Sequence, residues 1–295
     1  MKRAQRYDGR LAAQKVLDAL EASLAALRDA GITPGLAVVL VGEDPASEIY
    51  VKSKIAKCQA IGIESRLIRM PKDVSEAKLI SCIDQLNADP AISGILVQMP
   101  LPAHIDASHV LTTISAAKDV DGFHPDNVAK LVLGQPGLRP CTPSACIYLL
   151  KEAVPSLAGK HAVVIGRSNI VGKPVAAMLL NEHCSVTIVH SRSDRIEAIC
   201  AQADIVIAAV GKPRMVRASW IKPGAIVVDV GINRIREGDA DCIVGDVDQA
   251  SIEVLASFIT PVPGGVGPMT VAFLMRNTVK AAFMTAGLTH SSDLD

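Results

Sequence analysis

Short, uninterrupted apolar runs alternate with stretches of helical periodicity along most of this chain. An apolar run bounded by glycine is typical of a strand buried on both faces, as in a parallel sheet covered by helices. The alternation occurs twice, once in residues 1–140 and again in residues 141–270. It therefore predicts an α/β protein made of two α/β domains.

The first series predicts three helices and three strands. Leucines at helical spacing end at Gly31, a residue suited to the left-handed turn that closes a helix. The expected elements are helices at roughly 9–30, 45–61 and 75–87, and strands at 36–41, 66–69 and 92–97. Ligands of such a sheet gather at the carboxyl ends of its strands.

A connector rich in proline and glycine, residues 134–143, predicts a domain boundary. Beyond it the alternation restarts in the order of a Rossmann-like, doubly wound parallel sheet. The expected elements are strands at 161–165, 185–190, 204–210 and 225–230, helices at 174–182 and around Ile196, and a last helix over 270–286.

The charge balance excludes several classes of partner. Thirty lysines and arginines match thirty aspartates and glutamates, so the basic surface of a nucleic-acid binder or of a protein held on anionic lipid is missing. The seven cysteines are odd in number and lack C-x-x-C spacing, which favours reduced thiols in a cytosol. With no apolar run long enough for a membrane span, no export signal and no paired histidines, we expect a cytoplasmic protein without a metal site.

A glycine-bounded turn, Gly166–Gly172, follows the first strand of the second half and opens a helix. Backbone N–H groups and the helix dipole bind phosphate at such a turn, although a turn without a ligand is the alternative because G-x-G-x-x-G is absent. The next strand leads into Ser191 and Arg192, where an NAD enzyme commonly carries an acidic residue. Together with Arg167, Arg192 suits a 2′-phosphate and favours NADP; two solvated arginines are the alternative, and Asp194 nearby supports it.

Tyr50 and Lys54 lie four residues apart on an expected helix, so both side chains project from one face. Gln98 directly follows an expected strand, at the same sheet edge, and is held by a proline turn. A lysine beside a neutral amide among apolar walls can have a lowered pKa and transfer protons. The alternative is an ordinary surface helix, and for Asp121 the alternative is an Asp-Gly turn.

Residues 261–268 hold three prolines and three glycines in eight positions. Such a loop combines rigidity with close backbone approach. It predicts contact with a flat ligand or cofactor, through Pro263, Gly264 and Gly265.

Five strings together resemble the bifunctional methylenetetrahydrofolate dehydrogenase/methenyltetrahydrofolate cyclohydrolase family. They occur in the family's order and span nearly the whole chain. The strings are ASEIYVKSK at 46–54, QMPLP at 98–102, KDVDGFHP at 118–125, GRSNIVGKP at 166–174 and PVPGGVGPMT at 261–270.

The resemblance implies an enzyme of one-carbon metabolism and purine biosynthesis that oxidises 5,10-methylenetetrahydrofolate with NADP and hydrolyses the methenyl product to 10-formyltetrahydrofolate. It implies that Lys54 is the catalytic lysine, Tyr50 stacks on the folate, Gln98 tunes Lys54 and Asp121 grips the pterin. The expected cofactor-binding residues are Gly166, Arg167, Ser168, Ser191, Arg192, Gly211 and Ile232. Substrate contacts are Tyr50, Lys54, Gln98, Asp121, Pro263, Gly264 and Gly265.

The family fold implies a folate-binding domain of residues 1–140 plus 271–295, an NADP-binding domain of residues 141–270, a cleft between them and a homodimer. Two positions depart from the family pattern. Ala56 stands where the family often has lysine, with Lys57 beside it, and Asp126 is unexpected although Asn127 fits. The supporting role of a second lysine is therefore in doubt.

Three other functions are weighed against this one. A dehydrogenase that lost the hydrolytic step is disfavoured by the presence of both Lys54 and Gln98. A shikimate- or amino-acid-type dehydrogenase has no need of the Tyr-x-x-x-Lys and proline–glycine strings. A catalytically inactive NADP-binding regulator is separated from the enzyme only by turnover measurements.

Overall fold

The computed structural model describes residues 3–238, 240–291 and 294, and these form two compact units. The three-stranded unit joins Lys15–Cys141 with the residues from Val271 onward, and the six-stranded unit joins the residues up to Gln14 with Thr142–Thr270. Both units are built from alternating strands and helices, which confirms the α/β fold class. The residues before Lys15 group with the second half of the chain, not the first as expected, because strand β1 (Gln5–Arg6) pairs with β11 (Phe258–Ile259).

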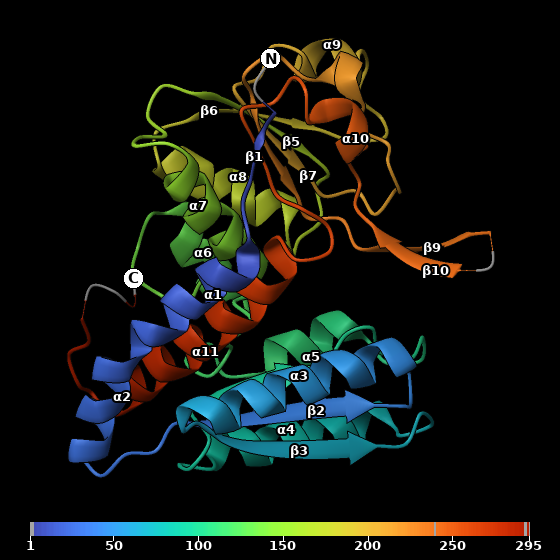
Figure 1. The fold of residues 1–295 in the computed structure, drawn as a ribbon. Coiled ribbons are helices and arrows are strands. Elements are labelled where there is room, and N and C mark those ends of the chain that lie inside the picture. Colours follow the sequence, from blue (N-terminus) through green and yellow to red (C-terminus); the bar gives the residue numbers. More distant parts are fainter. Residues whose placement is uncertain (1–2, 239, 292–293, 295) are drawn as a thin grey trace. The chain divides into compact units, whose positions relative to one another are not determined.

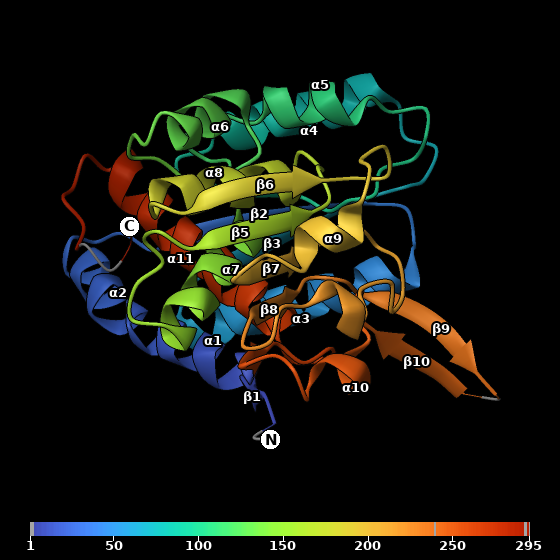
Figure 2. The ribbon, with the colours of Figure 1, turned by 90° about the horizontal axis from the view of Figure 1, so that it is seen from above.

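The three-stranded unit has a parallel sheet of order β3-β2-β4. All seven residues of β2 are buried, as the apolar run predicts. Helices α4 and α5 cover the face that carries Ala37, Val39 and Val41, and α3 covers the other (Figures 1 and 2). Elements that lie wholly in this unit are α2 (Leu20–Asp29), β2 (Gly35–Val41), α3 (Pro45–Ile61), β3 (Glu64–Met70), α4 (Glu76–Ala88), β4 (Gly94–Val97), α5 (Ala107–Thr113) and α6 (Pro125–Val132).

Local sequence sets the ends of helix α3, which carries two of the expected site residues. Asp44 caps its start by accepting the Ser47 N–H at 2.8 Å, and Pro45 occupies the first turn. Gly62 ends the helix with φ of 81°, in the left-handed region that glycine enters without steric cost. The helix therefore has the predicted bounds.

The six-stranded unit has a parallel sheet of order β1-β11-β8-β7-β5-β6 (Figure 2). Chain order reverses between β5 and β7, so this is the doubly wound arrangement whose ligands bind at the carboxyl ends of the strands on either side of the reversal. The predicted Rossmann-like fold is confirmed. Its elements after the connector are β5 (His161–Ile165), α8 (Gly172–Asn181), β6 (Ser185–Val189), α9 (Ile196–Cys200), β7 (Ile205–Ala208), η1 (Ala218–Trp220), β8 (Ile226–Asp229), β9 (Asn233–Glu237), β10 (Ala240–Val244) and α10 (Gln249–Ile252).

Three helices run through the boundaries of the units. These are α1 (Gly9–Asp18), α7 (Cys141–Ala153) and α11 (Val266–Thr285). The helix expected at 9–30 is divided into α1 and α2, with Ala19 between them. Because Ala19 keeps helical dihedral angles, the chain direction hardly changes. The last helix begins four residues before the expected start at residue 270.

The antiparallel hairpin of β9 and β10 was not expected from the sequence; it extends away from the sheet of its own unit (Figure 1). Its strands are mostly exposed and lack the apolar runs on which the strand predictions rest. Within the described part of the chain, no helix combines the length and the apolar character needed to cross a membrane.

Candidate active site

Lys54 and Gln98 meet in the three-stranded unit. The Lys54 ammonium donates to Oε1 of Gln98 across 2.9 Å, and both side chains are half-buried. Lys54 comes from helix α3, and Gln98 directly follows β4. Parallel strands and the helices that follow them converge at one sheet edge, so residues 44 positions apart in sequence share a site.

The Gln98 side chain is oriented by its own backbone surroundings. Its Nε2 donates to the carbonyl of Met99 at 2.7 Å, which leaves Oε1 as the acceptor that faces the ammonium. The Gln98 N–H in turn donates to Val39 O at 2.9 Å and so extends the sheet by one residue. The following Met99–Pro100 peptide bond is cis. Gln98 thus presents an oxygen at a fixed position beside Lys54.

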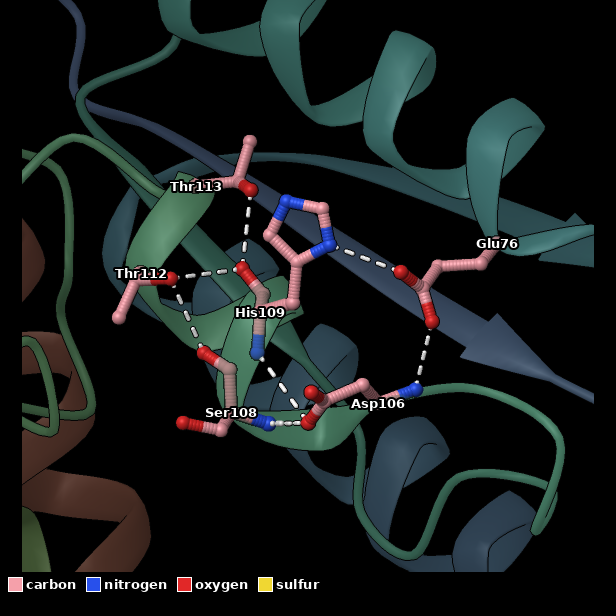
Figure 3. Close-up of polar contacts among 6 residues, drawn as sticks. All are labelled: Glu76, Asp106, Ser108, His109, Thr112 and Thr113. Atoms are coloured by element: carbon pink, nitrogen blue, oxygen red, sulfur yellow. Dashed lines mark hydrogen bonds and ion pairs between the residues drawn. The ribbon is translucent and has the colours of Figure 1, made fainter.

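The far end of the loop after Gln98 is anchored on helix α4 (Figure 3). Oε2 of Glu76 accepts the Asp106 N–H at 2.7 Å, and its Oε1 lies 2.8 Å from Nδ1 of His109. Asp106 caps helix α5 by accepting the Ser108 N–H at 2.8 Å. The bonds from the Asp106 N–H and from His109 lower the pKa of Glu76. The proline-rich loop is therefore fixed at both ends.

Asp121 lies in a loop that a second aspartate organises. The buried Asp119 carboxylate accepts the N–H groups of Gly122 and His124 at 3.1 and 2.7 Å, and the side-chain amide of Asn127 at 2.9 Å. Gly122 has φ of 75° and leaves no room for a Cβ, which would come within 2.5 Å of Pro140 N. The Asp-Gly turn is real, but the carboxylate that holds it is that of Asp119 and not that of Asp121.

The electrostatic setting of Asp121 is that of a binding carboxylate. Burial raises its pKa to about 6, the Lys54 ammonium acts in the opposite direction, and the negative charge of Asp119 adds to the rise. These effects place Asp121 within electrostatic range of Lys54. A lysine, an amide and a carboxylate of perturbed pKa therefore share one region of this unit.

Helix α11 contributes a residue that the sequence analysis missed. The buried Asn277 side chain donates to the carbonyls of Val120 at 2.8 Å and Arg139 at 2.7 Å. One amide group thus fixes both the residue next to Asp121 and Arg139 of the connector before α7. Nothing in the local sequence of α11 signals this contact, because its partners lie more than 130 residues away.

The other residues expected around Lys54 also lie on helix α3. Tyr50 is 42% exposed, so its ring is available for a ligand. Ala56 is exposed, whereas Lys57 is half-buried.

In the six-stranded unit, a cavity of about 310 Å³ lies at the carboxyl ends of β5 and β7. Four of the expected cofactor residues line it, and so do His190, Ile196, Lys212 and Met215, which were not expected to. Lys212 follows β7 and adds a cation to Arg167. Arg192 and Gly211 are not among the lining residues, although each adjoins one. The expected lining residues are Gly166, Arg167, Ser168 and Ser191.

The glycine-bounded turn is as tight as its sequence suggests. Gly166 has φ of 119°, and a Cβ there would stand 2.2 Å from the carbonyl oxygen of Ala209. Oγ of Ser168 accepts the N–H groups of Val171 and Gly172 at 3.1 and 3.3 Å, so it caps the turn and keeps only its own hydrogen to donate. Cations, close backbone and a 310 Å³ cavity suit the adenosine end of a dinucleotide.

The proline–glycine loop belongs to the six-stranded unit together with this cavity. The Val262–Pro263 bond is cis, and Gly264 has φ of 104°. The Gly9 N–H donates to Gly264 O at 2.9 Å, and a Cβ on Gly9 would stand 1.8 Å from Gly265 O. The loop is therefore packed against the start of helix α1. Ile232, also expected to bind cofactor, is 51% exposed and approaches the same loop at Gly267.

Comparisons with known proteins agree on one family. Residues 7–121 match the model of the tetrahydrofolate dehydrogenase/cyclohydrolase catalytic domain, and residues 140–286 match that of the corresponding NAD(P)-binding domain. The chain is 58% identical over 279 residues to bifunctional protein FolD 2 of Pseudomonas syringae pv. tomato, which covers 95% of this chain and 93% of that protein.

Two solved structures extend the likeness to three dimensions. The bifunctional methylenetetrahydrofolate dehydrogenase/cyclohydrolase of Campylobacter jejuni is 46% identical with a TM-score of 0.91, covering 94% of this chain and 98% of that one. The dehydrogenase-cyclohydrolase of Trypanosoma brucei, complexed with NADP cofactor and inhibitor, is 37% identical with a TM-score of 0.92, covering 97% and 99%.

Proposed function

The chain belongs to the tetrahydrofolate dehydrogenase/cyclohydrolase family, and from this we propose that Lys54, Gln98 and Asp121 carry the folate chemistry of a bifunctional enzyme. The enzyme oxidises 5,10-methylenetetrahydrofolate to the methenyl form with NADP. It then adds water to the methenyl carbon and yields 10-formyltetrahydrofolate. The 2.9 Å contact between Lys54 and Gln98, within electrostatic range of Asp121, is the observation that carries the assignment.

In this assignment the Asp121 carboxylate accepts hydrogen bonds from the amino group and ring nitrogen of the pterin. The acceptor oxygens of a carboxylate and the fixed loop around Asp121 support that role. Tyr50, exposed on the same unit, stacks on the folate. Both residues act on the two steps alike, because they hold the substrate and not the reacting water.

Lys54 acts at the hydrolytic step. Water that attacks the methenyl carbon must lose a proton, and an amine can accept it. The Oε1 atom of Gln98, 2.9 Å from Nζ, fixes the lysine position without adding a charge that would hold it as ammonium. The cationic substrate itself favours the neutral amine, since like charges repel.

The nucleotide cavity of the six-stranded unit suits NADP. When bound, NADP accepts the hydride that leaves the one-carbon bridge of the substrate. Arg167 and Lys212 line the cavity, and the neighbouring Arg192 supplies a third cation for the 2′-phosphate. Gly166 lets the backbone approach the ligand closely. The proline–glycine loop, through Pro263, Gly264 and Gly265, is proposed to contact the substrate.

A monofunctional dehydrogenase is the competing function, and the Lys54–Gln98 pair argues against it because hydride transfer alone moves no proton to the protein. The deciding assay supplies 5,10-methylenetetrahydrofolate with NADP and follows NADPH formation and the decay of methenyl absorbance separately. If the methenyl product accumulated and then decayed no faster than it does without enzyme, the bifunctional assignment would be contradicted.

Two further parts of the proposal concern the setting of the enzyme. We propose that residues 15–141 with the last helix bind folate while the six-stranded unit binds NADP, and that the chain forms a homodimer in the cytoplasm. The matches of residues 7–121 to the catalytic-domain model and of residues 140–286 to the NAD(P)-binding model support a division of tasks between two parts of the chain, and the free cysteines support the cytoplasmic location. Sedimentation at several protein concentrations tests the dimer, and cell fractionation tests the location.

A further inference from the structure

We propose that Asp246 is a positioning residue for NADP: its carboxylate holds residues 210–212 in the form that lines the nucleotide cavity. The inference rests on the proposed function in one respect, namely that this cavity binds NADP. Asp246 itself is not among the lining residues. It acts through residues 210–212, of which Val210 and Lys212 line the cavity.

Three consecutive backbone N–H groups converge on this one side chain. Oδ2 of Asp246 accepts from Val210 at 2.6 Å and from Gly211 at 3.0 Å, and Oδ1 accepts from Lys212 at 2.9 Å. The aspartate is fully buried, at 0% exposure. Burying a carboxylate is costly unless hydrogen bonds replace its water, and here the loop supplies them.

The bonds determine which side of the loop faces the cavity. Because the three N–H groups turn inward to Asp246, the cavity is lined by other atoms of Val210 and Lys212. Gly211 has φ of 64°, the left-handed turn that this wrapping requires. The preceding residue, Ala209, packs directly against Gly166 of the glycine-bounded turn. The loop and the turn thus form adjoining walls of one cavity.

Further hydrogen bonds hold Asp246 and its neighbour in place. The Asp246 N–H donates to Asp229 Oδ1 at 2.9 Å, and the Val247 N–H donates to Oδ2 of the same buried aspartate at 3.0 Å. Nδ2 of Asn233 donates to Asp246 Oδ1 at 2.9 Å. Two glycines, 231 and 245, permit this close packing, since a Cβ on Gly245 would stand 1.8 Å from Asp229 Oδ2. The loop is therefore preorganised before any ligand arrives.

The substitution Asp246→Asn tests the role with almost no change of shape. An amide has one accepting oxygen, so its NH2 group would face at least one backbone N–H. We expect the dissociation constant of NADP, measured by titration in the absence of folate, to rise about tenfold. Hydrolysis of supplied methenyltetrahydrofolate, assayed without NADP, should stay within about twofold of the wild type because it does not use this cavity.

Asp248→Asn is the matched control. It makes the same change two residues away, on a side chain that forms no capping bond to helix α10. The control should change neither NADP affinity nor hydrolysis.

Unchanged NADP affinity in a folded Asp246→Asn protein would overturn the proposal, and so would equal losses of NADP binding and hydrolysis. If Asp246→Asn fails to fold, Asn233→Ala decides, because it removes a single donor to the carboxylate. A severalfold rise in the dissociation constant then supports the proposal, and no change overturns it. Failure of the wild-type protein to bind NADP would refute the proposed function instead.

Discussion

Nζ of Lys54 and Oε1 of Gln98 lie 2.9 Å apart although they come from different elements, a helix and the residue after a strand. The contact links a proton-transferring group to a neutral acceptor with a fixed orientation. The two partners can be changed separately, and the first two predictions do so.

Replacing Lys54 with glutamine should abolish hydrolysis of methenyltetrahydrofolate while largely sparing hydride transfer. General base catalysis contributes about 10²- to 10⁴-fold, and glutamine cannot accept the proton. Stopped-flow absorbance of each step on its own provides the measurement. Lys57→Gln, on the same helix, is the control and should retain both activities. A Lys54→Gln enzyme that still hydrolyses at near the wild-type rate would transfer the role to Lys57.

Gln98→Glu should shift the pH dependence of hydrolysis upward. A carboxylate beside Lys54 favours the ammonium, so the neutral amine that accepts the proton appears only at higher pH. We expect the alkaline rise of the hydrolysis rate to move by about one pH unit or more, with hydride transfer changed less. An unshifted profile would show that Gln98 does not influence the protonation of Lys54.

Asp121→Asn should weaken both activities and yet stabilise the fold at neutral pH. The pKa of Asp121 is raised from 3.8 to about 6, so the folded protein binds the proton more tightly than the unfolded chain. Stability therefore falls as pH rises from about 4 to 6, and the full cost persists above pH 6. The variant should be more stable than the wild type by about 1–3 kcal/mol at pH 7.5, and by little at pH 4.

Urea denaturation at the two pH values measures that stability difference, and binding of a folate analogue tests the proposed contact. Equal affinity of the variant and the wild type for the analogue would remove Asp121 from the folate site. A loss of stability at pH 7.5 would instead contradict the raised pKa.

Arg167→Gln combined with Arg192→Gln should raise the Michaelis constant for NADP about 10- to 100-fold and leave NAD use nearly unchanged. Each charge-assisted bond to a 2′-phosphate contributes about 1.5–3 kcal/mol before screening. Lys212 also lines the cavity and will retain part of the preference. Arg236→Gln, exposed on β9, controls for the loss of surface charge. Equal weakening of both cofactors would make the two arginines structural only.

Asn277→Ala should destabilise the three-stranded unit by about 2–4 kcal/mol. The substitution leaves two carbonyls, those of Val120 and Arg139, without their shared donor in a buried setting. Because the released segment adjoins Asp121, both activities should fall together with the denaturation midpoint. Chemical denaturation and the two assays check this, and an unchanged midpoint would show that water replaces the amide.

The sequence predicts most of the fold because buried parallel strands are uninterrupted apolar runs, as in β2 and β5. The meeting of Lys54 and Gln98 follows from the rule that strand ends share an edge. Strands β1 and β11 have two residues each, too few for a pattern. The exposed hairpin of β9 and β10 has no apolar run to detect.

Asn277 and Asp246 were missed in the sequence analysis for the same reason. Asn277 and Asp246 act on backbone groups of loops that are 34 or more residues away along the chain. No spacing rule links a side chain to such a partner. Ser168 combines two features, because it lines the cavity and its oxygen also caps the glycine-bounded turn.

Contacts between segments that lie far apart in the sequence have a consequence for biosynthesis. Strand β1 is made about 250 residues before its partner β11. The carbonyls of Val120 and Arg139 likewise gain their donor only when Asn277 has been made. Since domains fold during synthesis from the N-terminal side, neither unit can be finished early. The β1–β11 pairing and the Asn277 contacts therefore form only after most of the described chain has been synthesised.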